Sequence, residues 1–447
     1  MAATNLARSI VGRLRAAGHV AYLVGGCVRD LLLGREPKDF DVATSARPDD
    51  LLRLFPRAEK VGAHFGVVIV HDAGVHESGE SVEVATFRSD LGYSDGRHPE
   101  EVRFESDPRA DALRRDFTIN ALFLDPDSGE VLDFVGGRAD LASCIVRAIG
   151  DPELRFREDH LRLLRAVRFA ARLGFAIDPA TFDAMRRLAP AVRGVSIERV
   201  RDEISRILTE GGARTGFSLL NDSGLLKEIL PEIVALQGVE QPPEFHPEGD
   251  VWIHTMIMLE GLPAGVSLEL ALGVLLHDVG KPATFRIADR IRFDGHVDKG
   301  MEIGRALMER LKFPNKTIDA AEALIANHMK FRDAPKMRVS RLKRFLRLPA
   351  FDEHLALHRL DCLSSHGALD NYDFCREKLA SLEPEELHPT RLITGADLIA
   401  AGFKPGPAFS AALTAVEDAQ LEGRVSSKEE ALAVALEKLS RPHPTSS

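Results

Sequence analysis

The chain has few cysteines and no long apolar run. Its 447 residues include only four cysteines, Cys27, Cys144, Cys362 and Cys375, and their spacing fits no metal-binding pattern. This excludes a disulfide framework and a zinc finger. No apolar run is long enough for a membrane span, and the first residues lack the pattern of a signal peptide. The sequence therefore predicts a cytoplasmic protein without a membrane partner.

Two common nucleotide-binding signatures are also missing around Gly25-Gly26. Neither the third glycine of a dinucleotide fingerprint nor the Gly-Lys-Ser/Thr of a P-loop follows this pair. Residues 21–24 predict a short strand and residues 28–33 the first turns of a helix. The glycine pair then lies at a strand-to-helix turn, where backbone N–H groups and the helix N-terminus attract phosphate. This predicts one half of a nucleotide site.

The segment Asp39-Phe40-Asp41 predicts the other half. On a strand, the period of two would place both carboxylates on one face and bury Phe40 on the other. Two such aspartates can share a pair of Mg²⁺ ions, as in phosphoryl or nucleotidyl transfer. An exposed acidic turn explains an isolated Asp-x-Asp better, but the nearby glycine turn favours the metal site.

The length and the hydrophobic pattern predict several domains. A chain of 447 residues with 45% hydrophobic content suggests about two to four of them. Strand-like runs concentrate in the first 150 residues, whereas helical spacing dominates from Glu158 onward. We expect domains at 1–150, 151–237, 238–375 and 376–447. The strand-like runs are 66–70, 81–85, 122–124, 130–134 and 145–149.

Two polar stretches are predicted to lack regular structure. Residues 238–250 contain proline and glycine and read as a linker. Residues 88–109, with 95–99 at their middle, read as a mobile loop beside the site. The net charge of −10 by itself disfavours a nucleic-acid partner, but basic residues clustered on one face would make the surface positive there.

Basic residues cluster at two places. Arg114, Arg115, Asp116 and Asn120 precede the strand-like run 122–124; the arginines suit a triphosphate, and the other two side chains could bind a ribose. A salt-bridged helix start is the alternative. Further on, Asp159 heads a stripe at helical spacing that fits a polyanion, although a solvated helix face is the simpler explanation. The stripe consists of Arg162, Arg165, Arg168 and Arg172.

Asp159 and Arg162 also suggest a device for reading a base. A carboxylate beside a guanidinium accepts from an exocyclic amine while it donates to a neighbouring ring nitrogen or carbonyl. Cytosine and adenine offer that edge, whereas uracil and guanine place a carbonyl where the amine should be. The charged group 198–203 either braces this template or pairs with exposed neighbours.

Histidines and aspartates recur through the third region in an ordered series. Imidazole and carboxylate ligands without thiolate suit Mg²⁺, Mn²⁺, Fe, Co or Ni better than structural zinc. Lone histidines are usually ordinary polar residues, but six such groups in this order make a metal site the better interpretation. They are His254, His277, Asp278, His296, His328 and Asp361.

The first region resembles the class II tRNA nucleotidyltransferase and bacterial poly(A) polymerase family. The resemblance is carried by residues 25–30, 39–41, 114–121, 158–162 and 198–201, in the family's order. The third region resembles an HD-type metal phosphohydrolase domain, as in bacterial CCA-adding enzymes with an HD tail. The resemblance implies an α+β fold, with a nucleotidyltransferase head followed by an all-helical neck, body and tail that contain the HD-type domain.

The resemblance also implies roles for individual residues. Asp39 and Asp41 would hold Mg²⁺, with Glu83 as a third catalytic carboxylate, and Asp159 with Arg162 would read the base. A tRNA 3′-hydroxyl would attack the α-phosphate of CTP or ATP, and pyrophosphate would leave. The loop at 95–99 would help the site switch from C to A addition. The other implied nucleotide-binding residues are Gly25, Gly26, Arg29, Arg115, Asp116, Asn120, Arg165 and Arg168.

For the HD-type part, the resemblance implies hydrolysis of 2′,3′-cyclic or 2′-phosphates. His254, His277, Asp278 and Asp361 would be the first ligands of a Mn, Ni, Co, Fe or Mg ion, and the pair His296 and His328 would serve a second ion.

Other functions stay open at this point. An enzyme adding only A or only CC, or a poly(A) polymerase, would share the same carboxylates and template. From a different class, the chain could be an HD phosphohydrolase whose head only docks RNA, or a non-catalytic tRNA-binding module. A monomer and a homodimer are both compatible with the sequence.

Overall fold

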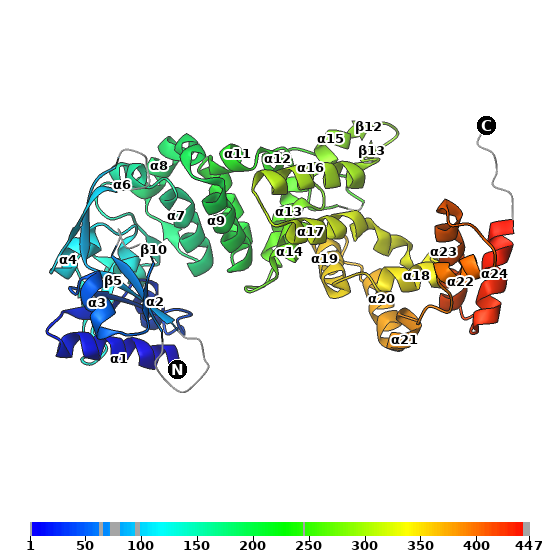
Figure 1. Ribbon diagram of the computed structural model, residues 1–447. Helices are drawn as coiled ribbons and strands as arrows, with labels where there is room; N and C mark the ends of the chain where they lie inside the picture. Colours follow the sequence, from blue (N-terminus) through cyan, green and yellow to red (C-terminus); the bar gives the residue numbers. More distant parts are fainter. Residues whose placement is uncertain (1, 62–65, 72–80, 94–98, 245, 441–447) are drawn as a thin grey trace. The chain divides into compact units, whose positions relative to one another are not determined.

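The computed structural model describes residues 2–61, 66–71, 81–93, 99–244 and 246–440 (Figure 1). These residues form two compact units. The first comprises the described residues up to Ala235 with Leu262–Val266 and Leu307–Phe313, and the second comprises Leu236–Gly261, Ser267–Ala306 and the described residues from Pro314.

A seven-stranded mixed sheet forms the centre of the first unit. Its strand order is β3-β4-β5-β2-β1-β8-β9, and β2 and β5 are the parallel pair, whereas the other neighbours are antiparallel. The strands are β1 (Ala21–Val24), β2 (Asp41–Thr44), β3 (Ala58–Lys60), β4 (Val67–His71), β5 (Ser81–Thr86), β8 (Leu122–Leu124) and β9 (Val131–Asp133).

Apolar side chains at the period of each element build the core of this unit. Helix α1 (Ala2–Ala16) buries Ala7, Ile10, Val11 and Leu14, which lie three or four residues apart and therefore on one face. A second cluster includes Val24 of β1 and Phe123 of β8. Helices α2 (Gly26–Leu32) and α3 (Pro48–Leu54) follow β1 and β2 in the chain (Figure 1).

One prediction about the first 150 residues was wrong, and another held only in part. The polar stretch 88–109 is not a continuous loop, because β6 (Arg88–Tyr93) pairs with β7 (Pro99–Phe104) as an antiparallel hairpin. Polar side chains are compatible with a two-stranded ribbon that has solvent on its faces. The middle of the predicted loop, 95–98, lies outside the described residues. The run 145–149 contributes only β10 (Ile145–Val146), which pairs with β11 (Ala176–Ile177) outside the main sheet.

Helices make up most of the rest of the first unit. Helix α7 (Arg162–Leu173) is amphipathic and ends at Gly174, whose left-handed conformation (φ 72°) is the usual helix stop. It packs against α10 (Ala213–Asp222) and against α9 (Ile197–Thr209), which lies beside it in Figure 1. The other helices are α4 (Pro108–Leu113), α5 (Gly137–Ala142), α6 (Pro152–Glu158), α8 (Pro179–Leu188), α11 (Leu225–Ile229) and α12 (Pro231–Val234), with 3₁₀ turns η2 (Thr118–Asn120) and η3 (Ala189–Gly194).

The second unit is a helical assembly around α14 (Leu268–Leu276). Every residue of α14 from Leu270 on is buried, as expected of a helix that is apolar on all sides. It packs against α13 (Val251–Glu260), α17 (Asn315–Asn327) and α19 (Phe351–Ser364). The remaining elements are α15 (Lys281–Thr284), the hairpin β12 (Arg286–Ile287) and β13 (Ile291–Arg292), α16 (His296–Arg310), η4 (His328–Lys336), α18 (Val339–Leu346), α20 (Asp370–Ser381), α21 (Pro384–Leu387), α22 (Gly395–Ala400), α23 (Pro407–Leu421) and α24 (Lys428–Ser440).

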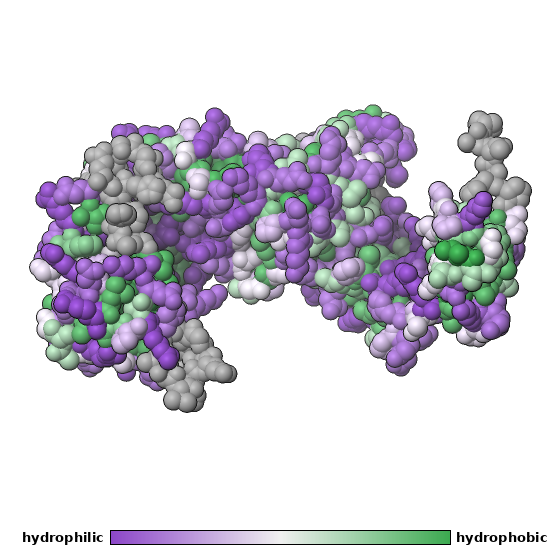
Figure 2. Space-filling view, in the orientation of Figure 1, coloured by the Kyte–Doolittle hydropathy of each residue, from purple (hydrophilic) through white to green (hydrophobic). Residues whose placement is uncertain are grey.

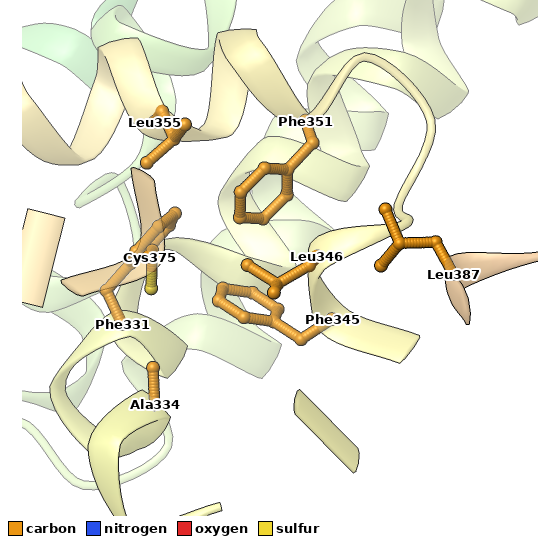
Figure 3. Packing of buried hydrophobic residues seen from close by; sticks show 8 residues of the cluster. All are labelled: Phe331, Ala334, Phe345, Leu346, Phe351, Leu355, Cys375 and Leu387. Carbon is orange, nitrogen blue, oxygen red and sulfur yellow. The ribbon is translucent and has the colours of Figure 1, made fainter. Parts of the chain in front are cut away.

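An aromatic cluster anchors η4 within this unit (Figure 3). Phe331 contacts the rings of Phe345 and Phe351, with centroid separations of 4.9 and 5.9 Å, and its ring stacks on His358 at 4.3 Å. The buried thiol of Cys375 belongs to the same cluster. This packing holds the start of η4 in place, and that is where His328 lies.

The predicted α+β class is confirmed, with a mixed-sheet head followed by mostly helical structure. Much of the visible surface is hydrophilic, with apolar residues in smaller patches (Figure 2). None of the helices in the described ranges has the length and apolarity to cross a membrane.

Candidate functional site

The glycine turn, a carboxylate and a guanidinium meet at the end of β1. Gly25 adopts φ 80°, a conformation that favours glycine. A Cβ atom at Gly25 would lie 3.4 Å from Nη1 of Arg115 and 3.6 Å from Oδ2 of Asp41. The turn thus brings three sequence-predicted residues from separate segments to one place, and a Cβ atom at Gly25 would be in van der Waals contact with the other two.

The predicted catalytic carboxylates lie around Asp41. Asp41 is the first residue of β2 and lies opposite Glu83 on the parallel neighbour β5. Phe40 is 5% exposed, as the alternating pattern predicted. Asp39 is exposed and precedes the strand, so the expectation that one strand carries both aspartates was wrong.

Burial and the negative charges of Glu83 and Asp39 raise the pKa of Asp41 to about 6, against the opposing effect of Arg115. Carboxylates crowded in this way gain from a divalent cation, and an all-oxygen donor set suits Mg²⁺. The residues present therefore fit the metal that the nucleotidyltransferase family implies.

The predicted nucleotide-binding residues form a hydrogen-bonded chain. Arg29, which is 2% exposed, donates to Oδ1 of Asn120 at 2.7 Å, and Nδ2 of Asn120 donates to Asp116 at 3.3 Å. Asp116 accepts in turn from Nε of Arg165 at 2.8 Å. Burial alone would raise the pKa of Asp116, but the Arg165 guanidinium lowers it to about 2. These side chains are therefore held in fixed orientations by one another.

Asp111 holds the two arginines of the motif and was not predicted as a site residue. Its buried carboxylate accepts from Nε of Arg114 at 2.9 Å and from Nη2 of Arg115 at 2.9 Å. Burial would raise the pKa of Asp111, but both guanidinium groups lower it. The available signal was the spacing of three and four residues between this aspartate and the arginines.

The predicted base-reading pair lies at the start of α7. Oδ2 of Asp159 accepts from Arg199 on α9 at 2.8 Å, so within the group 198–203 this arginine braces the Asp159 carboxylate. Arg162 pairs with Glu158 and donates to the carbonyl oxygen of Arg114 at 3.2 Å. Both template side chains keep partial exposure.

The four arginines of α7 do not form one open basic stripe, contrary to the expectation. Arg168 is 4% exposed and donates to Glu203 on α9 at 2.6 Å. Arg172 is 3.5 Å from Asp30 and 3.6 Å from Glu210. A buried guanidinium needs such a partner, so Arg168 ties α7 to α9 rather than facing a polyanion.

The six predicted His and Asp groups of the second unit do come together. They lie on α13, at the end of α14, at the start of α16, at the end of α17 and on α19. Nε2 of His254 is 3.2 Å from Asp361, and Nε2 of His277 is 3.0 Å from Oδ2 of Asp278. Oδ1 of Asp278 is 3.8 Å from Nε2 of both His296 and His328.

The donor atoms of this cluster fit a divalent metal ion. Nε2 of His254 and Nε2 of His277 are buried and make no hydrogen bond to any residue in the described ranges. Burial disfavours a positive charge, but Asp361 and Glu248 raise the pKa of His254 to about 9. Burial lowers the pKa of His328 to about 4 and also lowers that of His296. The imidazoles of His296 and His328 are thus neutral at pH 7, as metal-binding imidazoles must be.

Sequence reasoning missed three supporting residues of this cluster. Oε1 of Glu248 is 2.7 Å from Nδ1 of His254 and 2.9 Å from Nδ1 of His246. The stretch 238–250 is therefore part of the site and not only a linker. Nζ of Lys281 is 2.7 Å from Oδ2 of Asp278. Its position three residues after this aspartate was the available signal.

Close backbone packing brings the start of α16 to the cluster. A Cβ atom at Gly280 would lie 2.1 Å from the carbonyl oxygen of His296 and 2.5 Å from the amide nitrogen of Gly300. Beside the cluster lies a cavity of 310 Å³, whose wall includes Phe293, Met329 and Arg332.

Three family models match parts of the chain. The poly A polymerase head domain matches residues 21–147, a probable RNA- and SrmB-binding site of polymerase A matches 174–236, and a putative domain 2 of tRNA nucleotidyltransferases matches 300–436.

Known proteins resemble the chain along nearly its whole length. The CCA-adding enzyme of Levilactobacillus brevis is 32% identical over 97% of both chains, and that of Geobacillus stearothermophilus is 44% identical over 49% of this chain and 53% of its own. The crystal structure of the Bacillus stearothermophilus CCA-adding enzyme in complex with CTP matches with a TM-score of 0.72, at 29% identity over 97% of this chain and 96% of that chain. The Thermotoga maritima CCA-adding enzyme complexed with tRNA shares the fold, with a TM-score of 0.60 at 20% identity over 98% and 95% of the two chains. Sequence identity over nearly the full length, together with the matching head, places this chain in the family of CCA-adding tRNA nucleotidyltransferases.

Proposed function

We propose that this protein adds C, C and A in sequence to the 3′ end of tRNA, with CTP and ATP as donors. The observation that carries the proposal is the convergence of the Gly25 turn, Asp41 and Arg115 within contact distance. It joins a phosphate-binding turn, a metal-binding carboxylate and a guanidinium at one point. Family membership supports the same reaction.

Each group of side chains has a proposed task. Asp39, Asp41 and Glu83 would hold Mg²⁺, which when bound stabilises charge on the attacking and leaving oxygens. The backbone of the Gly25-Gly26 turn and Arg115 bind and orient the triphosphate. A second set, Arg29, Asp116, Asn120 and Arg165, positions the sugar and its surroundings through the hydrogen-bonded chain described above.

Base selection would rest on Asp159 and Arg162. The carboxylate accepts from the exocyclic amine of cytosine or adenine, and the guanidinium donates to the neighbouring acceptor. Uracil and guanine present a carbonyl oxygen to the carboxylate, which repels it. Arg199 keeps the carboxylate in place through the 2.8 Å contact.

The test uses three tRNA transcripts that end before CCA, after C and after CC. Each is incubated with Mg²⁺ and one labelled nucleotide, with the Asp39→Ala/Asp41→Ala double variant as the control. Sequential C, C, A addition that the control loses supports the proposal. Addition of A only or of CC only would assign a partial specificity, and no extension of any transcript would contradict the proposal.

A second activity is supported by the His/Asp cluster of the other unit. We propose that this cluster holds a divalent metal ion, such as Mn, Ni, Co, Fe or Mg, and hydrolyses small phosphoesters. The supporting observation is the pair of buried imidazole nitrogens, on His254 and His277, that face carboxylates without a hydrogen bond. The adjoining cavity of 310 Å³ has room for a small ligand.

Hydrolysis is measured with 2′,3′-cyclic AMP, 2′-AMP and p-nitrophenyl phosphate in the presence of each metal. The Asp278→Ala variant should lose the activity and keep nucleotide addition. No turnover of any substrate with any metal would contradict this second proposal and leave the first untouched.

A further inference from the structure

We propose that Arg172 is a positioning residue for base selection. From the C-terminal end of α7 it ties this helix to α2, and it thereby fixes where Asp159 and Arg162 lie relative to the Gly25 turn. The inference deepens the first function proposed above and rests on it in assuming that Asp159 and Arg162 read the base. Arg172 lies in the last turn of α7, about 15 Å along the helix from its base-reading end.

The guanidinium of Arg172 lies between two carboxylates from separate elements. Its Nη2 donates to Oδ2 of Asp30 on α2 at 3.5 Å, and its Nη1 is 3.6 Å from Oε2 of Glu210, which follows α9. Oε2 of Glu210 is buried and has no hydrogen-bond partner in the described part of the chain, and Arg168 lies 3.5 Å from it. A carboxylate removed from water is costly without a compensating positive charge. Arg172 therefore serves both neighbours of α7.

Asp30 connects Arg172 to the nucleotide site. Its Oδ1 accepts from Nε of Arg29 at 2.8 Å, while its Oδ2 accepts from Arg172. Arg29 in turn donates from Nη1 to Oδ1 of Asn120 at 2.7 Å. The side chains of Arg29 and Asp30 are 2% and 8% exposed, so water screens these contacts little. A hydrogen-bonded path thus runs from the far end of α7 through α2 to a residue of the proposed sugar-binding set.

An aromatic contact joins α7 to α2 beside this path. The guanidinium carbon of Arg29 lies 5.4 Å from the centroid of the Phe169 ring on α7, and Phe169 is 5% exposed. The guanidinium groups of Arg168 and Arg165 also lie over this ring, at 4.3 and 5.2 Å. A cation over an aromatic face is attracted by the ring, and more strongly where water is excluded. The contact holds Arg29 against α7, whereas the two carboxylates around Arg172 define a position along the helix.

Two charged ties on one face determine how α7 lies. Arg165 and Arg172 are close to two helical turns apart, so both lie on the same side of the helix, about 10 Å apart along its axis. Arg165 ties this face to Asp116, and Arg172 ties it to Asp30. One tie alone would let the helix pivot, whereas two oppose both pivoting and sliding. Because a misplacement of about 1 Å can cost about 100-fold in rate, the second tie bears on the base-reading end.

The test compares the incorporation of CTP and UTP on a tRNA transcript that ends before CCA. Arg172→Met keeps the apolar stem and removes both contacts. It should lower kcat for CTP about tenfold and raise the ratio of UTP to CTP incorporation about tenfold, because a displaced Asp159 carboxylate repels uracil less. Arg172→Lys replaces the fork by a single ammonium, so its effects should be smaller. Arg186→Met alters an exposed arginine on α8 and should leave the ratio unchanged.

Glu210→Gln is a second variant, which keeps the side-chain size and removes the charge of one partner of Arg172. It should change the ratio in the same direction as Arg172→Met. Binding of CTP and of UTP without tRNA is measured on all of these proteins, together with their thermal unfolding. A merely structural role would lower the unfolding temperature and leave the ratio of UTP to CTP unchanged in both assays, and this result would overturn the inference.

Failure of the proposed function is recognised separately. A parent protein that extends no transcript but binds CTP more tightly than UTP would refute CCA addition, and the binding ratio of Arg172→Met would then decide the inference. A parent protein that adds C, C and A, with an unchanged ratio in Arg172→Met, would refute the inference and leave CCA addition standing. A parent that distinguishes CTP from UTP in neither assay would also overturn the inference, since no base selection would exist for Arg172 to support.

Discussion

Asp41 and Glu83 lie directly opposite each other on the parallel strands β2 and β5. Forty-one residues separate them in sequence, and the sheet register alone makes them neighbours. Burial, Glu83 and Asp39 together raise the pKa of Asp41 to about 6, so the metal-free head carries an electrostatic cost that a cation would remove.

The first prediction concerns the free energy that it costs the folded, metal-free protein to keep Asp41 charged. The pKa of Asp41 is raised on folding, so the folded state binds its proton more tightly than the unfolded state, and stability falls as the pH rises from about 4 to 6. Above pH 6, Asp41→Asn should therefore stabilise the metal-free protein by on the order of 1–3 kcal/mol. Thermal unfolding in EDTA at pH 5 and pH 7.5 measures the difference. Asp49→Asn, at an exposed carboxylate, should change stability by less than about 0.5 kcal/mol. Equal stability of Asp41→Asn and the parent at pH 7.5 would contradict the argument.

The second prediction tests how the base is read. Asp159→Asn replaces an acceptor-only carboxylate by an amide that can donate to the carbonyl of uracil. The ratio of UTP to CTP incorporation should rise by about tenfold or more, because the repulsive contact with uracil is removed. Single-nucleotide extension of a tRNA transcript that ends before CCA measures the ratio. An unchanged ratio, with activity retained, would place base selection elsewhere.

The third prediction addresses Arg199, which in the proposed base-reading pair would act on the base only through Asp159. Removing its charged hydrogen bond in Arg199→Met should lower kcat/KM for CTP and ATP by about tenfold. The loss should disappear in the Asp159→Asn background, because the partner charge is absent there. Arg193→Met alters an exposed arginine and serves as the matched control. Additive losses in the double variant would mean that Arg199 acts by another route.

The fourth prediction concerns Glu248, which holds Nδ1 of His254 and so fixes which nitrogen faces the cluster. Glu248→Gln should weaken Mn²⁺ binding about 10–100-fold, because such outer partners orient the ligand and strengthen its basicity. Isothermal titration in the Asp39→Ala/Asp41→Ala background measures the affinity. Glu244→Gln, at an exposed neighbour, should leave it unchanged. An unaltered Mn²⁺ affinity in Glu248→Gln would contradict the inference that Glu248 orients His254 for metal binding.

Local patterns were sufficient for several parts of the structure. The strands at 21–24, 81–85 and 122–124 follow from short apolar or alternating runs, and the structure has them as β1, β5 and β8. The hairpin β6–β7 was missed because its strands are polar and carry little hydrophobic signal. The partner of β10 could not be read from the sequence, because β11 lies 31 residues further along the chain.

In the candidate sites, too, some residues could be predicted from the sequence and others could not. The residues with chemical roles could be named in advance, because carboxylates, guanidinium groups and imidazoles are recognisable by type and spacing. The residues that hold these groups in place could not be named in advance. In the sequence, Asp111, Glu248 and Lys281 look like ordinary surface charges, and only their burial and contact distances identify them. The same holds for Arg168, which reads as exposed on a helical wheel and is buried against Glu203.

The sequence by itself determined the class of fold, the family and the candidate site residues, because periodicity and motif spacing are local properties of the chain. Tertiary structure decided which of those groups meet. Glu83 faces Asp41 only through a strand register, and Asp278 reaches His296 and His328 only because the ends of α14 and α17 and the start of α16 lie together. Such contacts depend on packing between distant segments, and the free energy of that packing cannot be inferred from any single stretch of sequence.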